Sequence, residues 1–370
     1  MSDVQGQTAP GFERVREVMA GNIASGADLG ASFAVTHRGE MVVDLWGGWA
    51  DIAKTRPWER DTIVNVWSTT KTMTALCALM LADRGVIDFA APVATYWPEF
   101  AQNGKEGVTV AHLMSHTAGL PTWDEPLAKE ELYDWDLCVS RLAAQKPRWE
   151  PGTQAAYHAI TQGYLVGEVI RRADGRSLGT FFREEVAEPL GADFHIGLPA
   201  SEDGRVAEMI PPERPADAPR GNPPVDPVDT GTRAWRAAEI PAAGGTGNAR
   251  AVAAIHAILA NGGEAQGQRF LSEAGVRKAL EIQFVGTDKA LGMPARYGLG
   301  FGVAGEGSLI PFPNPNSMYW GGWGGSLALI DMDARVSIAF MMNRMAGGTV
   351  GDTRAFGLAL ATWEALRQHA

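Results

Sequence analysis

The sequence predicts an α+β fold, an α/β sandwich in which helices flank an antiparallel sheet and a mainly helical domain is inserted. Three observations lead to this prediction. β-like runs lie near both ends of the sequence, helical periodicity fills the middle, and consecutive β-like runs are joined by short connections, as antiparallel pairing allows. The length of 370 residues suits two domains. We expect residues 1–66 and 240–370 to form the sheet domain and residues 67–239 to form the helical domain.

The elements of the sheet domain follow from local spacing. Residues 10–20 carry apolar side chains at helical intervals, and residues 31–36 and 41–46 read as two strands joined by a turn at 38–40. Further β-like runs are expected at residues 298–304, 318–323, 326–332 and 336–342. A closing helix is predicted over residues 353–367. The first and last helices should therefore cover the sheet.

The middle of the chain is helical in character. Residues 69–84 form the strongest predicted helix, which Gly85 ends. Weaker helices are expected at residues 109–115, 127–144, 161–173 and 178–187. Residues 199–231 are rich in proline, aspartate and arginine, which is typical of a long surface loop of the kind that often serves a function. An alanine-rich helix over 250–261 follows, with Asn248 as its expected cap.

Composition excludes several classes of function. The net charge is −11, which argues against a nucleic-acid partner and against binding to an anionic membrane. No apolar run reaches the roughly 18 residues that a membrane-spanning helix needs. The N-terminal residues lack the basic and apolar regions of an export signal, so we expect a cytoplasmic protein. The only cysteines, Cys77 and Cys138, give no disulfide framework.

A serine and a lysine lie one helical turn apart where the helix predicted for residues 69–84 begins. Ser68 precedes that helix and Lys71 follows three residues later, so the two side chains share a face. Burial and the positive end of the helix dipole would both disfavour protonated Lys71. Lowering a lysine pKa from about 10.4 to about 7 takes roughly 4 kcal/mol. A neutral Lys71 could accept the proton of Ser68 and activate it as a nucleophile; the alternative is a capping serine beside a surface lysine.

Further motifs follow in a fixed order. Serine enzymes that recognise penicillin carry S-x-x-K, then a tyrosine or serine at the cleft edge, then a glycine-containing strand. Here the corresponding segments are His-Thr-Ala-Gly-Leu-Pro at 116–121, Pro-Gly before Tyr157, Pro-Ala-Ala-Gly-Gly-Thr-Gly at 241–247 and Trp-Gly-Gly at 320–322. From about residue 10 to its C-terminus the chain resembles the serine β-lactamase-like superfamily of class C β-lactamases and penicillin-binding proteins. Within it, the chain looks most like the family VIII carboxylesterases.

The resemblance implies a β-lactamase/transpeptidase-like fold and a serine carboxylesterase that hydrolyses short-to-medium acyl esters without a metal or a cofactor. Ser68 would attack the ester carbonyl, while Lys71 and Tyr157 would share the role of base and Tyr157 would protonate the leaving alcohol. The backbone N–H groups of Ser68 and Trp323 would bind the oxyanion. The substrate-binding residues would be Trp320, Gly321, Gly322 and His158.

Two departures from the family pattern bear on the substrate. The tyrosine motif of β-lactamases is Tyr-x-Asn, but here it is Tyr157-His158-Ala159, which lacks the amide that would hold a β-lactam side chain. The third motif usually begins with lysine or histidine, but here it begins with Trp320, which removes a cation suited to a β-lactam carboxylate. Both departures favour a neutral small-molecule ester. A supporting or wall position is the preferred interpretation for His158.

Other functions stay open at this point. The same scaffold could transfer the acyl group to an alcohol, act as a β-lactamase or D-alanyl peptidase, or serve as a non-catalytic binding protein. The missing export signal argues against the peptidoglycan and β-lactam substrates. The presence of Ser68, Lys71 and Tyr157 together argues against a non-catalytic protein.

Some local signals are interpreted as structural. Residues 175–179 match G-x-S-x-G, but a helical run precedes Ser177, where a nucleophile elbow needs a strand. His112 and His116 have zinc-like spacing without the glutamate of the protease motif, so structural histidines are expected. Cys77 lies on the apolar face of the Ser68 helix and is expected to be a buried, inert thiol.

Overall fold

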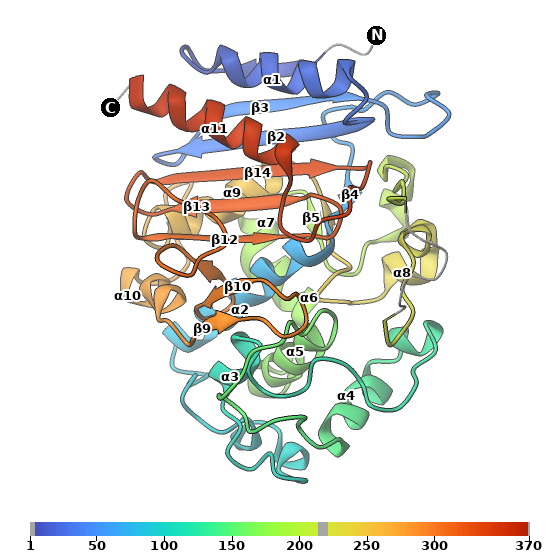
Figure 1. The fold of residues 1–370 in the computed structure, drawn as a ribbon, viewed down its shortest axis with the longest axis vertical. Helices are drawn as coiled ribbons and strands as arrows, with labels where there is room; N and C mark the ends of the chain where they lie inside the picture. The colour runs from blue at the N-terminus through green and yellow to red at the C-terminus, as the bar shows by residue number, and fades with distance from the viewer. Residues whose placement is uncertain (1–3, 214–220, 369–370) are drawn as a thin grey trace.

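The computed structural model describes residues 4–213 and 221–368, and its architecture confirms the predicted α+β fold (Figure 1). Within these residues the centre is a nine-stranded sheet in the order β1-β3-β2-β14-β13-β12-β11-β10-β9, with every neighbouring pair antiparallel. Its strands are β1 (Gln5–Thr8), β2 (Gly30–His37), β3 (Glu40–Gly48), β9 (Phe284–Thr287), β10 (Pro294–Tyr297), β11 (Gly302–Val303), β12 (Ser317–Gly321), β13 (Leu327–Asp331) and β14 (Val336–Met342).

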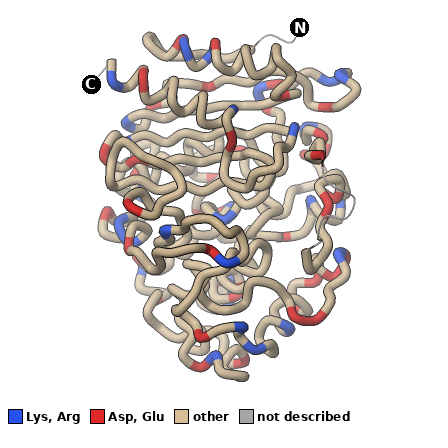
Figure 2. Tube along the Cα trace, in the orientation of Figure 1, with Lys and Arg blue, Asp and Glu red and all other residues tan. Residues whose placement is uncertain are grey.

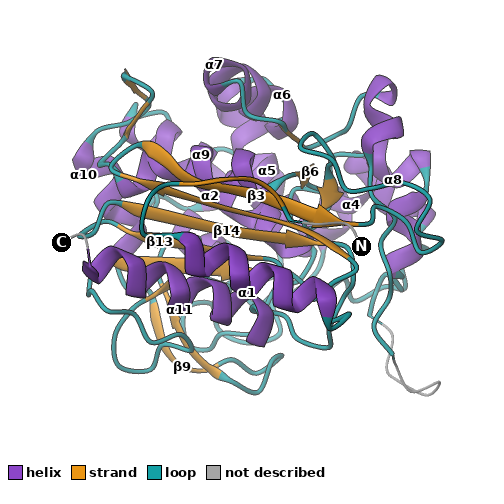
Figure 3. Cartoon of the chain, turned by 90° about the horizontal axis from the view of Figure 1, so that it is seen from above, coloured by secondary structure: helices purple, strands orange, loops and turns teal. Residues whose placement is uncertain are grey.

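Helices cover both faces of the sheet. Seen from above, α1 (Glu13–Ala24) and α11 (Thr353–Gln368) lie on one face, and α9 (Ala249–Ala260) lies on the other (Figure 3). Alternate side chains of β14 point to the two layers. Ile338 and Phe340 pack in the apolar cluster of α1 and α11, whereas Met341 packs in the cluster that contains α9. The predicted covering helices are therefore confirmed.

The remaining helices lie around and below the sheet in Figure 1, with α3, α4 and α5 at the bottom, α8 at the right and α10 at the left. They are α2 (Thr70–Asp83), α3 (Val110–Met114), α4 (Trp135–Ala144), α5 (Thr161–Asp174), α6 (Leu178–Phe182), α7 (Glu188–Leu190), α8 (Arg233–Ala237) and α10 (Glu273–Arg277). Short strands β4 (Val64–Asn65), β5 (Phe194–His195) and β6 (Thr246–Gly247) form a small sheet, and β7 (Glu264–Ala265) pairs with β8 (Gln268–Arg269). One apolar cluster contains residues from both predicted domains, so the division at 66/67 and 239/240 stays a prediction.

The structure corrects several expected strands. The run 298–304 is not one strand, because the chain turns between β10 and β11, where Gly300 has a φ of +90° and a Cβ on Gly298 would lie 2.2 Å from the Ala279 carbonyl oxygen. β12 ends at Gly321, so Trp323 lies in the turn before β13. Strands β1 and β9 were missed, because each is only 4 residues long and carries mostly exposed side chains at an edge of the sheet.

Two expected helical segments are also different. The helix predicted over 127–144 begins only at α4, where the Asp134 side chain accepts from Leu137 N, because a 3₁₀ turn over Glu130–Tyr133 precedes it. The helix predicted over 178–187 is α6 followed by a π-helical turn at Arg183–Ala187. The predicted loop 199–231 contains 3₁₀ turns at Ala200–Arg205 and Pro227–Gly231, and residues 214–220 of it lie outside the described part.

Charged residues of both signs are interspersed along the chain trace in Figure 2. The described helices also include none with the length and apolar character needed to cross a membrane.

Candidate active site

Ser68 lies in a 3₁₀ turn (Trp67–Thr69) that leads directly into α2. Trp67, the residue before it, has a φ of +50°, a left-handed conformation that is strained for a tryptophan. The Trp67 ring is buried between Trp235 and Trp323, with ring centroids 5.7 and 5.0 Å away. This packing fixes the strained residue, and Ser68 is left partly exposed between buried neighbours.

Lys71 lies one turn further along α2 and is fully enclosed. Its Nζ is 3.2 Å from Ser68 Oγ, 2.7 Å from the Ala159 carbonyl oxygen and 2.9 Å from the Ala242 carbonyl oxygen. Burial holds the pKa of Lys71 well below its usual range. The two carbonyls come from segments that precede α5 and α9, so three distant parts of the chain converge on this amine.

Tyr157 lies on the other side of Lys71, just before α5. Lys71 Nζ is 4.8 Å from the centre of its ring. Burial raises the pKa of Tyr157, while hydrogen bonds with the Ser68 and Trp320 side chains act in the opposite direction. The structure thus brings Ser68, Lys71 and Tyr157 together, as the motif order predicts.

Asp288, which sequence reasoning missed, holds Tyr157 in place. Its Oδ1 accepts from Tyr157 N at 3.1 Å, and its Oδ2 accepts from the Tyr297 hydroxyl at 2.9 Å. The same carboxylate also accepts from Ala290 N and Leu291 N, at 2.8 and 2.9 Å. No local pattern marks this residue, because its main partner is 131 positions away.

Trp320 and His116 support Tyr157 from a buried aromatic cluster. Trp320, on β12, is 7% exposed and stacks on His116 with ring centroids 5.3 Å apart. The Tyr157 and Tyr297 rings lie 5.9 and 5.8 Å from Trp320. Burial lowers the pKa of His116 well below its usual range, so its neutral ring serves as part of the wall. Trp320 therefore gives this wall an uncharged surface.

His158 lies behind this wall. Its Nε2 accepts from Leu120 N at 3.1 Å and its Nδ1 lies 2.6 Å from the Ala156 carbonyl oxygen. Burial lowers its pKa to about 4. Both ring nitrogens are thus used by the backbone of this chain. The arrangement corresponds to the supporting position that the sequence favoured and leaves His158 no free nitrogen for a substrate.

The turn between β12 and β13 brings Trp323 beside Trp67, the neighbour of Ser68, with ring centroids 5.0 Å apart. Ser326, at the end of this turn, donates to the Val66 carbonyl oxygen at 2.8 Å and lies 3.0 Å from Thr69 Oγ1. A Cβ on Gly322 would lie 2.4 Å from that same carbonyl oxygen, so the close approach requires glycine. Trp323 follows directly, and the turn is attached to the residues on both sides of Ser68.

A buried arginine that sequence reasoning also missed fixes the outer side of this turn. Arg354 is 7% exposed and donates to the Gly324 carbonyl oxygen at 2.8 Å. It pairs with Asp28 at 2.8 Å and with Asp352 at 2.6 Å. Burial raises the pKa of Asp28 to about 6 and outweighs the attraction of Arg354.

An apolar pocket opens beside Tyr157. Its cavity is small, with a volume of about 30 Å³. Its lining residues are Tyr157, Leu291, Met293, Pro294, Tyr297, Leu309, Tyr319, Trp320, Gly321, Thr349 and Val350. Gly321 thus joins Trp320 at the pocket wall, while Gly322 lies against the nucleophile segment.

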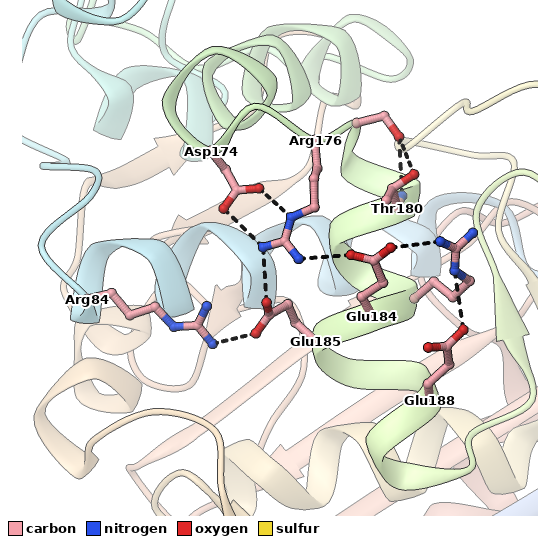
Figure 4. Close-up of polar contacts among 9 residues, drawn as sticks. Arg84, Asp174, Arg176, Thr180, Glu184, Glu185 and Glu188 are labelled. Carbon is pink, nitrogen blue, oxygen red and sulfur yellow. Dashed lines mark hydrogen bonds and ion pairs between the residues drawn. The ribbon is translucent and has the colours of Figure 1, made fainter.

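The rejected motifs lie away from this site. Ser177 caps α6 and donates to Glu239 Oε1 at 2.6 Å. The residue before it, Arg176, forms ion pairs with Asp174, Glu184 and Glu185 (Figure 4).

The remaining structural interpretations can be placed as well. His112 completes a capping box with Thr109 at the start of α3, and Cys77 is a buried thiol whose pKa burial raises. Across residues 4–213 and 221–368, no cluster of three or more His, Cys, Asp or Glu could hold a metal ion.

Comparisons with known proteins show the family and the fold of this chain. The Beta-lactamase family model matches residues 15–362. A solved family VIII carboxylesterase is 44% identical, with a TM-score of 0.92 over 98% of this chain and 99% of that one. A penicillin-binding protein homologue from Caulobacter crescentus is 38% identical, with a TM-score of 0.91 over 98% of this chain and 100% of that one. Esterase/beta-lactamase LipL of Mycobacterium tuberculosis is 37% identical over 92% of this chain and 83% of its own length.

The fold is that of the penicillin-recognising serine enzymes. The chain belongs to the β-lactamase family, and its predicted resemblance to the family VIII carboxylesterases is confirmed.

Proposed function

We propose that this enzyme hydrolyses small neutral carboxylic esters through an acyl-enzyme on Ser68, with Lys71 as the base and Tyr157 as the acid. The chain is a serine esterase of the β-lactamase family. The main observation that supports Lys71 as the base is the set of three oxygen atoms around its Nζ.

The three oxygen contacts of Lys71 are compatible with a neutral amine. A neutral amine has two N–H donors and one lone pair, whereas an ammonium has three donors. The carbonyls of Ala159 and Ala242 take two donors, at 2.7 and 2.9 Å. The third direction leads to Ser68 Oγ at 3.2 Å, so the lone pair of neutral Lys71 is positioned to accept the serine proton.

The opposite shifts of the two neighbouring groups support separate roles. Burial lowers the pKa of Lys71 and raises that of Tyr157, so both shifts favour the neutral form of the group. Lys71 Nζ takes the proton as Ser68 Oγ bonds to the ester carbon. The C–O bond to the alcohol then breaks, the leaving oxygen takes the Tyr157 proton, and the proton on Lys71 returns to Tyr157. No net proton is gained or lost by the enzyme in acylation.

The backbone N–H groups of Ser68 and Trp323 are the proposed oxyanion donors. One such donor is typically worth about 3 to 4 kcal/mol in acyl transfer. Deacylation repeats the same steps with water: a base removes its proton, the oxygen bonds to the acyl carbon, and Ser68 Oγ leaves with that proton. The products are a carboxylic acid and a free serine.

The wall chemistry supports a neutral ester over a β-lactam. A β-lactam carries a carboxylate, and an unpaired carboxylate is costly to desolvate. Trp320 places an indole ring where the family pattern has a cation, and it is 7% exposed. Ala159, which replaces the asparagine, supplies only its carbonyl to Lys71. A small-molecule ester without a charge therefore fits these surroundings best.

Intact-mass measurement after mixing with p-nitrophenyl acetate tests the proposal. We expect one added acetyl group on the wild-type enzyme and on Ser177→Ala, and none on Ser68→Ala. Ser177 is the matched control because it is the serine of the rejected G-x-S-x-G motif. Acetylation that persists in Ser68→Ala, or that disappears in Ser177→Ala alone, would contradict the assignment. An added alcohol that yields a new ester would show acyl transfer in place of hydrolysis.

A further inference from the structure

A single buried arginine is bonded to the turn between β12 and β13. An arginine side chain has five N–H donors in a planar fork, and Arg354, at the start of α11, uses all of them. Nε and Nη2 donate to Asp352 at 3.0 and 2.6 Å, and Nη1 donates to Asp28 at 2.8 Å. The remaining two donors reach the backbone carbonyl oxygens of Gly324 and Arg344, each at 2.8 Å.

The two carbonyls belong to segments that are far apart in sequence and adjacent in space. Gly324 is part of the turn, and Arg344 follows β14. The segments are also bonded directly, because Ala346 N donates to the Gly324 carbonyl oxygen and Gly324 N donates to the Gly348 carbonyl oxygen, both at 2.8 Å. The polar groups of Gly324 are therefore fully used on the outer side of the turn.

The backbone of the turn is permissive and needs a support of this kind. Gly324 and Gly325 have φ values of +94° and +124°, in the region that favours glycine. A Cβ on Gly325 would lie 2.4 Å from Asp352 Oδ2 and 2.6 Å from Arg354 Nη2. The guanidinium and its carboxylate thus lie directly against two consecutive glycines, whose conformational freedom they limit.

Trp323 lies between this outer support and an inner one. On the inner side, Gly322 N donates to the Ser326 carbonyl oxygen at 2.9 Å, and Ser326 Oγ donates to the Val66 carbonyl oxygen at 2.8 Å. The residue on the other side of Trp323 is Gly324, which the arginine fork holds. The place of the Trp323 backbone relative to the nucleophile segment is thus set from both sides.

The shape of the fork matters more here than its charge. The positive charge of Arg354 faces the carboxyl groups of Asp28 and Asp352, so it is not directed at the reacting atoms. A lysine would keep the charge, but its single nitrogen has three donors and no planar fork. It could not hold Asp352 through two atoms and both backbone carbonyls at once.

We propose that Arg354 is a positioning residue of the esterase: through the Gly324 carbonyl it sets the place of the Trp323 N–H. The proposal rests on the proposed function, because it needs that N–H as an oxyanion donor. The oxyanion forms in acylation and again in deacylation, so a displaced donor slows both steps.

Arg354→Lys tests the proposal, with rates referred to the amount of Ser68 that can be acetylated. We expect the acylation and deacylation rate constants for p-nitrophenyl acetate both to fall by about 10- to 100-fold, since about 1 Å of misplacement can cost about 100-fold. Because both steps slow together, kcat should fall while KM stays nearly constant. Wild-type rate constants, or a fall in one step alone, would overturn the proposal.

The carbonyl band of the acetyl-enzyme gives a readout that a change in fold stability alone does not move. Hydrogen bonds from the oxyanion donors polarise the acyl carbonyl and lower its stretching frequency. In infrared difference spectra made with p-nitrophenyl acetate labelled at its carbonyl carbon, the band of Arg354→Lys should move to higher wavenumber. Slower rates with an unmoved band would mean that Arg354 acts elsewhere and would overturn the proposal.

Arg171→Lys is the matched control. Arg171 donates from Nε and Nη2 to the buried carboxylate of Glu168 at 2.7 and 3.0 Å, so this substitution also removes a fork from a buried acid. Its ion-pair partners, Glu168 and Asp136, lie outside the Trp323 turn. Thermal unfolding should detect a loss of stability in both variants, whereas the rate constants and the carbonyl band should change only in Arg354→Lys.

A second variant keeps the test decisive if Arg354→Lys does not fold. Asp352→Asn leaves one acceptor oxygen in place of two, so the fork is loosened while Arg354 and Gly324 both remain. Both rate constants should fall by a smaller factor, with the band moving in the same direction; unchanged rates and band would overturn the proposal. Absence of acetylation at wild-type Ser68 would overturn the proposed function itself, whereas wild-type acetylation that neither variant alters overturns the positioning role alone.

Discussion

The two sides of the proposed site are held in place by opposite chemistry. On the base side, Lys71 is fixed by Ser68 and two backbone carbonyls, and the described residues place no carboxylate in an ion pair with it. On the oxyanion side, the turn that carries Trp323 is fixed by a buried ion cluster of Arg354, Asp28 and Asp352.

The difference follows from what each side must do. A carboxylate beside Lys71 would favour the ammonium form and remove the base. The Trp323 turn transfers no proton, so charge there can serve to fix the backbone without affecting a catalytic pKa. Charge is therefore kept away from the group that must titrate and used where only geometry is required.

A permanent charge on the base side should have the largest effect. Arginine in place of lysine keeps the charge but cannot act as a base near neutral pH. We expect Lys71→Arg to reduce the rate of Ser68 acetylation by about 10³ to 10⁴, the upper range for loss of a general base. Stopped-flow release of p-nitrophenol measures it, with thermal unfolding as the control for folding. An arginine variant with a tenth of wild-type activity would break the comparison.

The pH dependence sharpens the same point. In the proposed mechanism neutral Lys71 is the active form, so wild-type kcat/KM should rise with pH as the amine loses its proton. This rising limb lies below the usual range of a lysine because burial lowers the pKa of Lys71. If kcat/KM instead stayed constant as the pH was lowered to the range where esters hydrolyse without enzyme, the result would contradict a titrating base.

Removing a charge from the oxyanion side should change the free energy of unfolding, and by less than the loss of the base raises the barrier to acylation. The pKa of Asp28 is about 6 in the folded protein, against a reference value of 3.8. The folded state therefore binds more protons than the unfolded state between these values, and stability falls as pH rises through this window. The difference corresponds to about 3 kcal/mol at neutral pH.

Asp28→Asn isolates this contribution. The unfolding free energy of the wild-type protein minus that of the variant should fall by up to about 3 kcal/mol between pH 4 and pH 7. Denaturant unfolding at several pH values measures it. A difference that increases with pH would mean that the pair with Arg354 outweighs burial and that Asp28 is a stabilising ion.

Asp288 is a carboxylate on the base side, and it contacts Tyr157, one of the two groups proposed to transfer protons. It accepts from Tyr157 N and raises the pKa of Tyr157 through its charge. We expect Asp288→Asn to lower the acylation rate by about tenfold, since an amide cannot accept all the donors of the carboxylate. The alkaline limb of kcat/KM should also move to lower pH, because Tyr157 would lose its proton more easily. A rate loss without this movement would indicate a purely structural role.

Sequence reasoning found the parts of the site that local chemistry marks and missed those that distant contacts create. Ser68 and Lys71 share one helical turn, and Tyr157 and Trp320 stand in recognisable segments, so the residue types and their order were sufficient to predict them. Asp288 and Arg354 act through partners 131 and 30 positions away, which no local spacing encodes.

The limits of the fold prediction have a similar cause. The long, strongly patterned elements such as α2 and β14 were predicted, whereas the edge strands β1 and β9 were not. Each of these edge strands pairs on one side only and shows little apolar alternation. Gly300 and Gly298 looked like strand residues, but the turn that they permit depends on the approach of Ala279 and could not be seen locally.

The smallest effect is expected at the ion-pair network around Arg176, which neither contacts Lys71 nor fixes the Trp323 turn. Arg176 pairs with Asp174, Glu184 and Glu185 (Figure 4). Ser177, the next residue, caps α6 by accepting from Thr180 N at 3.2 Å and donates to Glu239 Oε1 at 2.6 Å. Ser177→Ala should lower the unfolding free energy by about 1 kcal/mol, the usual cost of losing a helix cap, and leave kcat/KM unchanged. Thermal unfolding and ester hydrolysis on the same sample measure both quantities. A tenfold loss of kcat/KM at full stability would mean that Ser177, the serine of the G-x-S-x-G motif, takes part in the reaction. The active site would then not be the one around Ser68, and the comparison of its two sides would not apply.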